Sequence, residues 1–123
     1  RDGQPNPNMI FRVAVREIES WLLGDAEAFA AFIGIHPSNI PIAVDELADP
    51  KQTLLNLVRR SNRKALKEAL LPRIGSTASI GREYNDVLSD YVERHWRPAV
   101  ARESSRSLDK AIHALSVFQP QWN

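Results

Sequence analysis

The chain has 123 residues, of which 43% are hydrophobic and 25% charged, a composition typical of one folded domain and not of a disordered chain. It contains no cysteine, which excludes disulfides and thiolate metal sites and fits the reducing cytoplasm, the compartment in which we expect the protein. No apolar run reaches the roughly 18 residues needed to span a bilayer, so we expect no membrane partner.

Charge is unevenly distributed along the chain, although the net charge is only +1. Residues 1–50 hold three basic and eight acidic residues, whereas residues 51–123 hold thirteen basic and seven acidic residues. This asymmetry indicates an anionic partner for the basic half. Neutralisation of the two halves across an internal interface explains it equally well.

The amino-terminal part predicts a loop, a strand and a helix in that order. Residues 1–8 are rich in glycine, proline and asparagine, as loops are. Residues 9–15 (MIFRVAV) alternate apolar side chains with a period of two, which predicts a strand. From residue 16 to 23 the spacing becomes helical and places Glu19 within the apolar arc and Glu17 outside it.

Five further helices follow in the predicted order. A capping aspartate precedes each of the first two, at Asp25 and Asp49, and Pro50 stands at a favourable first helical position. The apolar spacing predicts helices over residues 26–33, 50–60, 62–71, 84–96 and 107–118. The chain is therefore expected to be mainly α with one or two short strands. A single strand cannot satisfy its own edges, so we expect residues 1–123 to be one domain that is a fragment of a larger fold.

Several common chemistries find no support in the sequence. The three histidines lack the spacing of a zinc site, and His95, on the apolar stripe of residues 84–96, is interpreted as a core histidine with its hydrogen bonds satisfied. Residues 75–81 (GSTASIG) resemble a phosphate-binding loop only superficially, because the glycine spacing and the residues after Gly81 differ from that motif. No nucleophile elbow occurs.

One basic stretch is a stronger candidate for a binding site than these motifs. Its members are Arg59, Arg60, Arg63, Lys64 and Lys67, opposed nearby only by Glu68. Such a cluster binds phosphates through charge and counterion release, and an ordinary solvated helix face is the alternative. Three aromatic residues at helical spacing, Trp21, Tyr84 and Trp96, could stack on bases, but we expect them in the core.

Glu19 is the candidate catalytic residue. Mg²⁺ or Mn²⁺ in metal-assisted phosphoryl transfer requires carboxylate oxygens that converge from separate segments. Glu19, with Glu17 as a weaker second, could supply one ligand, and Asp2 another. A carboxylate at the rim of the core, paired with Arg16 or with a cation of the basic half, is equally compatible with the spacing.

The segment VAVREIESWLLGD (13–25) resembles the signature of the bacterial domain-of-unknown-function family 4276, whose members are similar to Toprim proteins. The resemblance continues through four shorter motifs in the same order, DPKQTLLNLVRRS (49–61), GREYN (81–85), HW (95–96) and SRSLDKAI (105–112). It departs from the family at Gly24, where alanine is usual, and at Arg82 and Arg106, where proline is common.

This resemblance implies the carboxy-terminal part of an α/β Toprim-like domain whose first half precedes the chain. It implies a magnesium- or manganese-dependent nuclease when full length, with the family's glutamate at Glu19 and Asp2 as the second member of an Asp-x-Asp pair. The fragment alone would be inactive. Family members often accompany ABC- or AAA-type ATPases in what look like phage-defence loci.

Two functional hypotheses follow. In the first, the chain is part of a nuclease in which Glu19 and Glu17 serve catalysis and the basic stretch holds nucleic acid. In the second, it is a non-catalytic adaptor that docks on an ATPase. A purely structural role for Glu19, in an internal salt bridge, remains open beside both.

Overall fold

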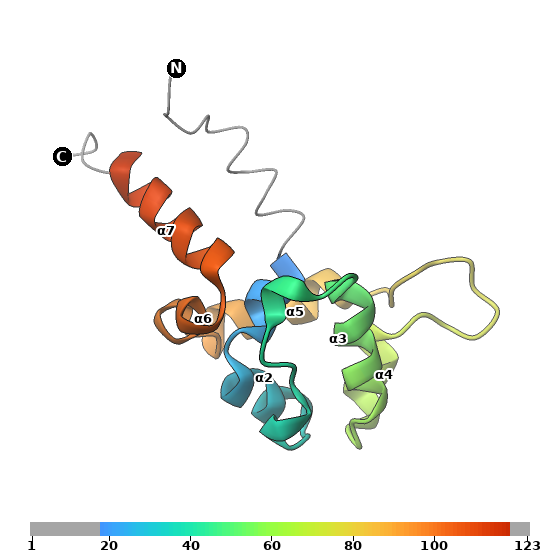
Figure 1. Ribbon diagram of the computed structural model, residues 1–123. Helices are drawn as coiled ribbons and strands as arrows, with labels where there is room; N and C mark the ends of the chain where they lie inside the picture. The colour runs from blue at the N-terminus through green and yellow to red at the C-terminus, as the bar shows by residue number, and fades with distance from the viewer. Residues whose placement is uncertain (1–17, 119–123) are drawn as a thin grey trace.

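The computed structural model describes residues 18–118 (Figure 1). Helices dominate this range and no strand occurs in it, which confirms the prediction of a mainly α fold for the described residues. The strand predicted at residues 9–15 lies outside them, as do Asp2, Arg16 and Glu17.

A helical segment at residues 18–23 comes first. The predicted loop between residues 34 and 49 contains two short 3-10 helices, η1 and η2. The labelled elements are α2 (Ala26–Ile33), η1 (Pro37–Asn39), η2 (Val44–Glu46), α3 (Pro50–Arg59), α4 (Lys64–Leu70), α5 (Tyr84–Arg94), α6 (Pro98–Ser104) and α7 (Arg106–Phe118).

Local capping signals set the ends of the first helices. The Asp25 carboxylate accepts a hydrogen bond from the Ala28 amide at 3.2 Å, and Asp49 accepts one from the Gln52 amide at 3.1 Å. Each bond satisfies an amide that has no partner within its own helix. Gly34 ends α2 in the left-handed conformation with a φ of 78°, which glycine adopts without strain. Both predicted caps are thus confirmed.

Residues 84–104 form two helices where the apolar spacing predicted one. We expected a single helix over residues 84–96, but α5 ends at Arg94 and a second helix, α6, begins at Pro98. Proline is well tolerated at the first helical position because that amide has no helical partner to lose. Pro98 therefore begins a helix.

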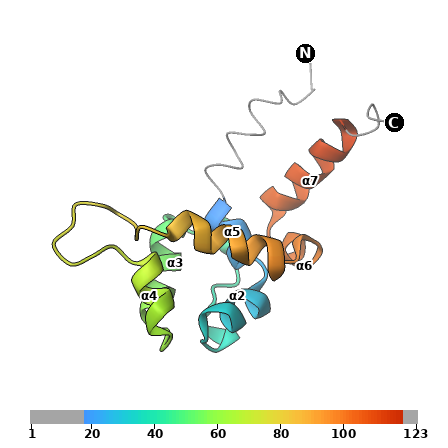
Figure 2. The same ribbon diagram turned by 180° about the vertical axis from the view of Figure 1, so that it is seen from behind.

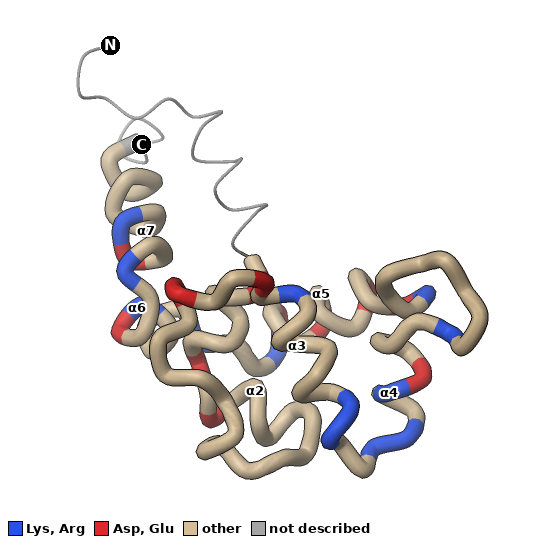
Figure 3. Tube along the Cα trace, turned by 45° about the vertical axis from the view of Figure 1, so that its right-hand side comes forward, with Lys and Arg blue, Asp and Glu red and all other residues tan. Residues whose placement is uncertain are grey.

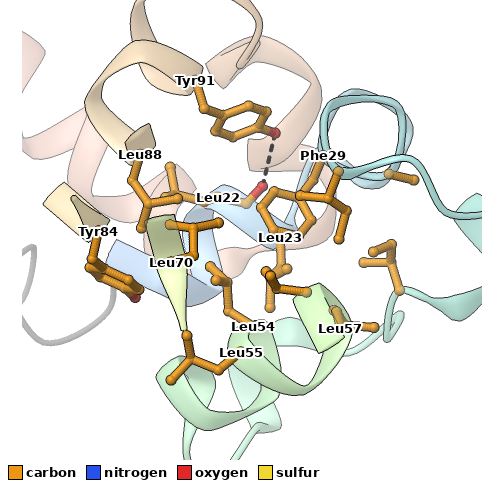
Figure 4. Close-up of a cluster of buried hydrophobic side chains, with 14 of the residues drawn as sticks. Leu22, Leu23, Phe29, Leu54, Leu55, Leu57, Leu70, Tyr84, Leu88 and Tyr91 are labelled. Carbon is orange, nitrogen blue, oxygen red and sulfur yellow. Dashed lines mark hydrogen bonds between the residues drawn. The ribbon is translucent and has the colours of Figure 1, made fainter. Parts of the chain in front are cut away.

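The segment at residues 18–23 lies at the centre of the fold. Residues 19–25 are all buried, and Figure 4 shows Leu22 and Leu23 surrounded by side chains from the neighbouring helices. These neighbours include Phe29 of α2, Leu54 and Leu55 of α3, Leu70 of α4, and Tyr84, Leu88 and Tyr91 of α5. Because the segment is surrounded by other helices, its apolar residues Trp21, Leu22 and Leu23 are all buried, and so are its polar residues Glu19 and Ser20.

Helix α7 leaves this core and projects away from the other helices (Figures 1 and 2). Its base packs through Leu108 into a second, smaller cluster with Trp21 and Ala101. Its far half exposes Leu115 and Val117, with relative exposures of 49% and 51%. The apolar stripe of α7 therefore runs from the core outward to solvent.

A loop at residues 71–80 projects on the other side of the molecule, beyond α4 (Figures 1 and 2). Its two ends are fastened together, because the Gly81 amide donates to the Leu70 carbonyl at 2.8 Å and the Glu83 amide donates to the Ala69 carbonyl at 3.2 Å. Gly81 is buried. A Cβ atom there would overlap the Ala69 carbonyl oxygen and the Leu70 backbone, so this closure requires glycine.

We therefore predict that Gly81→Ala lowers the free energy of unfolding by about 1–3 kcal/mol, because the clash is with backbone that cannot rotate away. Urea denaturation measures the change. Thr77→Ala in the same loop is the control, since Thr77 is exposed and such changes stay within about 0.5 kcal/mol. Equal stability of the Gly81 and Thr77 variants would contradict the prediction.

Candidate functional site

Glu19 projects from the central segment and is 8% exposed. Its Oε2 accepts a hydrogen bond of 2.8 Å from the hydroxyl of Tyr84, the first residue of α5. Burial, followed by the bond to Glu19, raises the pKa of Tyr84 well above its ordinary value, so this phenol keeps its proton and donates. Within the described part of the chain, the partner of Glu19 is thus a neutral hydroxyl and not a cation. The pairing with Arg16 lies outside the described residues.

Asp25 holds the other end of the buried segment. Arg97 donates to Asp25 from Nε and from Nη2, both at 2.8 Å, and from its backbone amide at 3.1 Å. Burial alone would raise the pKa of this carboxyl, but the hydrogen bonds from Arg97 and Ala28 outweigh it and lower the pKa below its ordinary value. Asp25 is therefore ionised and serves as the structural anchor between α2 and the start of α6.

A third carboxylate, Asp45, fastens η2 to α7. The hydroxyls of Ser105 and Ser107 donate to Asp45 Oδ1 at 2.7 and 3.1 Å, and the Ser107 amide donates to Oδ2 at 2.9 Å. The same Ser107 hydroxyl accepts from Trp21 Nε1 at 2.8 Å. These bonds lower the pKa of Asp45 against the opposing effect of burial. The network ties α7 to the central segment.

The sequence analysis missed Arg97, Asp45, Ser105 and Ser107. One signal was present, because a serine before an apolar helical run is a capping signal, and Ser105 Oγ accepts from the Leu108 amide at 3.1 Å. Nothing in the sequence links Asp45 to residues 105–107 or Asp25 to Arg97. All four residues act in packing the fold.

The aromatic residues behave as expected. Trp21 and Tyr84 are buried and Trp96 is half-buried, and the Trp96 indole donates to the Trp21 carbonyl at 3.0 Å. Placement in the core is confirmed, which removes these rings as platforms for stacking bases.

Several basic residues lie along α4 and at the end of α3, shown in blue in Figure 3, and others lie on α5 to α7. A groove with a volume of about 1110 Å³ opens between α4 and the chain that follows it. We call it the basic groove. Its charged lining residues are Lys64, Lys67, Glu68, Arg73, Arg82 and Glu83. Among residues 18–118, none of its four cations lies within 4.0 Å of a carboxylate, so their charge remains available to a ligand.

The structure divides the predicted basic stretch. Lys64 and Lys67 line the basic groove together with Arg73 and Arg82, two residues that the sequence analysis did not single out as ligand-binding. The remaining three arginines are exposed and donate hydrogen bonds to neutral oxygens. Arg59 donates to the side-chain oxygen of Asn56, Arg60 to the side-chain oxygen of Asn39, and Arg63 to the backbone carbonyl of Ala31. Their charges are held in place but not neutralised.

A second hollow, of about 460 Å³, lies beside α2. Arg63, His95, Arg97, Glu27 and Phe32 contribute to its lining. The interpretation of His95 as a core residue was wrong, because it is exposed and rests against the rings of Phe32 and Tyr91. His95 directly follows the last residue of α5, so the helical spacing that predicted its burial no longer applies there. Arg97 is committed to Asp25, so this hollow offers less free positive charge than the basic groove.

A metal site is not completed by the described residues. Within residues 18–118 no three histidine, aspartate or glutamate side chains are placed to hold one ion. The predicted ligand pair of Glu19 and Asp2, and the second acid Glu17, extend beyond this range. The magnesium or manganese site therefore stays a prediction that depends on acids outside the described residues. In the same range, no helix combines the length and the apolar composition that crossing a bilayer requires.

Comparison with known proteins decides nothing further. No family model, curated protein or solved structure matches the chain. The resemblance to the Toprim-like family 4276 accordingly remains a prediction from the motifs alone. The geometry of the described residues carries the functional argument.

The Asp25–Arg97 pair predicts how stability depends on pH. Because folding lowers the pKa of Asp25, the stabilisation is present above the ordinary carboxyl pKa and is lost as the pH falls through the lowered value. Asp25→Asn should lower the free energy of unfolding by about 1–3 kcal/mol at pH 7, because Asp25 is buried but half of the Arg97 side chain is exposed to screening solvent. The difference from the unmodified protein should shrink between about pH 5 and pH 2.

Thermal melts at several pH values measure this effect. Asp90→Asn is the matched control, because Asp90 forms an exposed pair with Arg94 at 2.7 Å, and exposed pairs contribute about 0–1 kcal/mol. A cost for Asp25→Asn that is the same at pH 7 and pH 2 would overturn the role assigned to the ionised carboxylate.

Proposed function

We propose that the chain binds the phosphates of nucleic acid in the basic groove, as the carboxy-terminal part of a Toprim-like, metal-dependent nuclease. The observation that carries the proposal is the convergence of Lys64, Lys67, Arg73 and Arg82 on one groove. The core does not need these charges, since none of these four residues takes part in the hydrogen-bond networks of Asp25 and Asp45.

The charge distribution around the groove supports a polyanion over a single small anion. Residues 51–73 hold seven basic residues and one acidic residue, and Arg59 and Arg60 at the end of α3 directly precede the groove residues 61 and 62. A ligand with regularly repeated phosphates gains from every such contact through counterion release. A small anion would need only two or three of them.

Glu19 is connected to the groove through Tyr84, which directly follows two groove residues in the chain. Arg82 and Glu83 line the groove, and the next residue, Tyr84, turns inward and donates to Glu19. A carboxylate oriented by such a hydrogen bond is favourable for a metal ligand, and its second oxygen retains acceptor capacity. With acids such as Asp2 supplied from outside residues 18–118, Mg²⁺ or Mn²⁺ at Glu19 would activate water for attack on a bound phosphodiester.

A second candidate function is an adaptor for an ABC- or AAA-type ATPase. Leu115, which continues the stripe of Leu108 and Ile112 toward the far end of α7 and is 49% exposed, favours it, because an uncovered apolar position on a helix face can contact a partner. This interaction would require no metal and would depend little on salt.

Salt dependence tests the first function. Binding of a fluorescently labelled DNA or RNA oligonucleotide should weaken steeply as salt rises, because each phosphate contact releases counterions. Lys64→Ala and Lys67→Ala should each weaken binding for all sequences alike and reduce the slope of log K against log salt by about 1.

Lys110→Ala on α7 is the control, since Lys110 is exposed but lies far along the chain from the groove residues. It should leave both the affinity and the slope unchanged. Binding that is equally weak in all three variants, or that ignores salt, would contradict the assignment of the groove.

Cleavage tests the catalytic part of the proposal. The natural full-length protein with Mn²⁺ should cut end-labelled nucleic acid, and Glu19→Gln should abolish cleavage while leaving oligonucleotide binding intact. The glutamine keeps an oxygen that can accept from Tyr84, so the thermal midpoint should change little. Loss of cleavage together with a large fall in the midpoint would assign Glu19 to folding, and unchanged cleavage would exclude it from the metal site.

A further inference from the structure

Ile74 stands at a position that the fold does not explain. Its relative exposure is 106%, and it belongs to the loop at residues 71–80, which extends beyond α4 (Figure 2). Full exposure of a large aliphatic side chain forgoes the favourable free energy that its burial would supply. Ile42, at 90% exposure, is the comparable residue elsewhere in the chain.

The turn around Ile74 is hydrogen-bonded. The Ser76 amide donates to the Arg73 carbonyl at 3.0 Å, and Gly75 has a φ of 86°, the value that the third residue of a type II turn requires. The Ser76 hydroxyl in turn accepts from the Ala78 amide at 3.0 Å. Ile74 therefore occupies the second position of a defined turn, where its side chain is presented outward.

Ile74 also belongs to the wall of the basic groove. It is adjacent in sequence to Arg73 and shares the groove with Lys64, Lys67 and Arg82, whereas Ile42 lines neither hollow. A groove that combines several unpaired cations with one protruding aliphatic side chain matches a ligand that carries both phosphates and flat apolar faces. A nucleic acid carries both, as phosphates on its backbone and as bases.

We propose that Ile74 is a wedge that packs against or between adjacent bases of a nucleic acid whose phosphates occupy the basic groove. The proposal rests on the proposed function of that groove. Aliphatic side chains flanked by cations perform this role in architectural proteins, where they partly unstack one base step. The ligand class is thus a nucleic acid with a deformable base step, and Ile74 is a residue that contacts bases without reading a hydrogen-bonding pattern.

The experiment uses a DNA duplex that contains 2-aminopurine, whose fluorescence rises when it is unstacked. The purified protein should increase this fluorescence at saturation. Ile74→Ser should remove most of the increase and weaken binding by about tenfold, the effect of losing a partly buried aliphatic side chain. The salt slope should not change, because all four groove cations remain.

Ile42→Ser is the matched control, since it removes an equally exposed isoleucine and should alter neither signal. Equal melting temperatures of the two variants verify that both are folded. Lys67→Ala should reduce the salt slope while keeping the fluorescence increase at saturation, which separates phosphate contacts from base contacts.

The outcomes are distinguishable. If the unmodified protein binds no oligonucleotide at low salt, both the proposed function and the wedge are overturned. If it binds with a steep salt slope but Ile74→Ser behaves like Ile42→Ser, the wedge alone is overturned. If Ile74→Ser instead loses binding to vesicles of phosphatidylserine and phosphatidylcholine while oligonucleotide binding is unchanged, Ile74 serves membrane contact and the wedge is again overturned.

Discussion

A short helical segment that is buried on every side governs this structure. Residues 19–25 have little room for water, so each polar group there needs a partner from another element. Tyr84 supplies one for Glu19 and Arg97 for Asp25. The Tyr91 hydroxyl donates to the Leu22 carbonyl at 3.2 Å (Figure 4). Among the described residues, no buried side-chain polar atom lacks a partner. The positions of α5 and α6 follow from these bonds.

This constraint separates the charged residues into two groups. The carboxylates Asp25 and Asp45 accept several hydrogen bonds that hold elements together, so their oxygens are already occupied. The cations around α4 bond neutral groups or make no ion pair in the described part of the chain, and their charge reaches solvent. Glu19 differs from both groups, because its partner among the described residues is the neutral hydroxyl of Tyr84, which follows the groove residues Arg82 and Glu83 in the chain. The side chains available to bind a ligand are therefore those that do not hold the helices together.

The sequence predicted local features well and tertiary relations poorly. Caps at Asp25 and Asp49 and the end of α2 at Gly34 depend on neighbours within four residues, and all were correct. His95 was misread because it continues the apolar spacing of α5, although that helix ends at Arg94, and α6, which begins at Pro98, was not predicted. The groove was half predicted: Lys64 and Lys67 stand in an evident basic run, but Arg73 and Arg82 join them only because the Gly81 amide closes the intervening loop onto Leu70.

The sequence by itself determined that residues 18–118 are mainly helical, that its central segment is apolar and that its basic residues cluster after residue 58. Spacing, capping and composition are local, so they can be read without coordinates. Only the tertiary structure decided what the buried carboxylates bond, since Glu19 and Tyr84 are 65 residues apart and Asp25 and Arg97 are 72 apart. It alone also decided that Ile74 stands exposed among cations. Partners distant in sequence are chosen by packing, and packing depends on the whole chain at once.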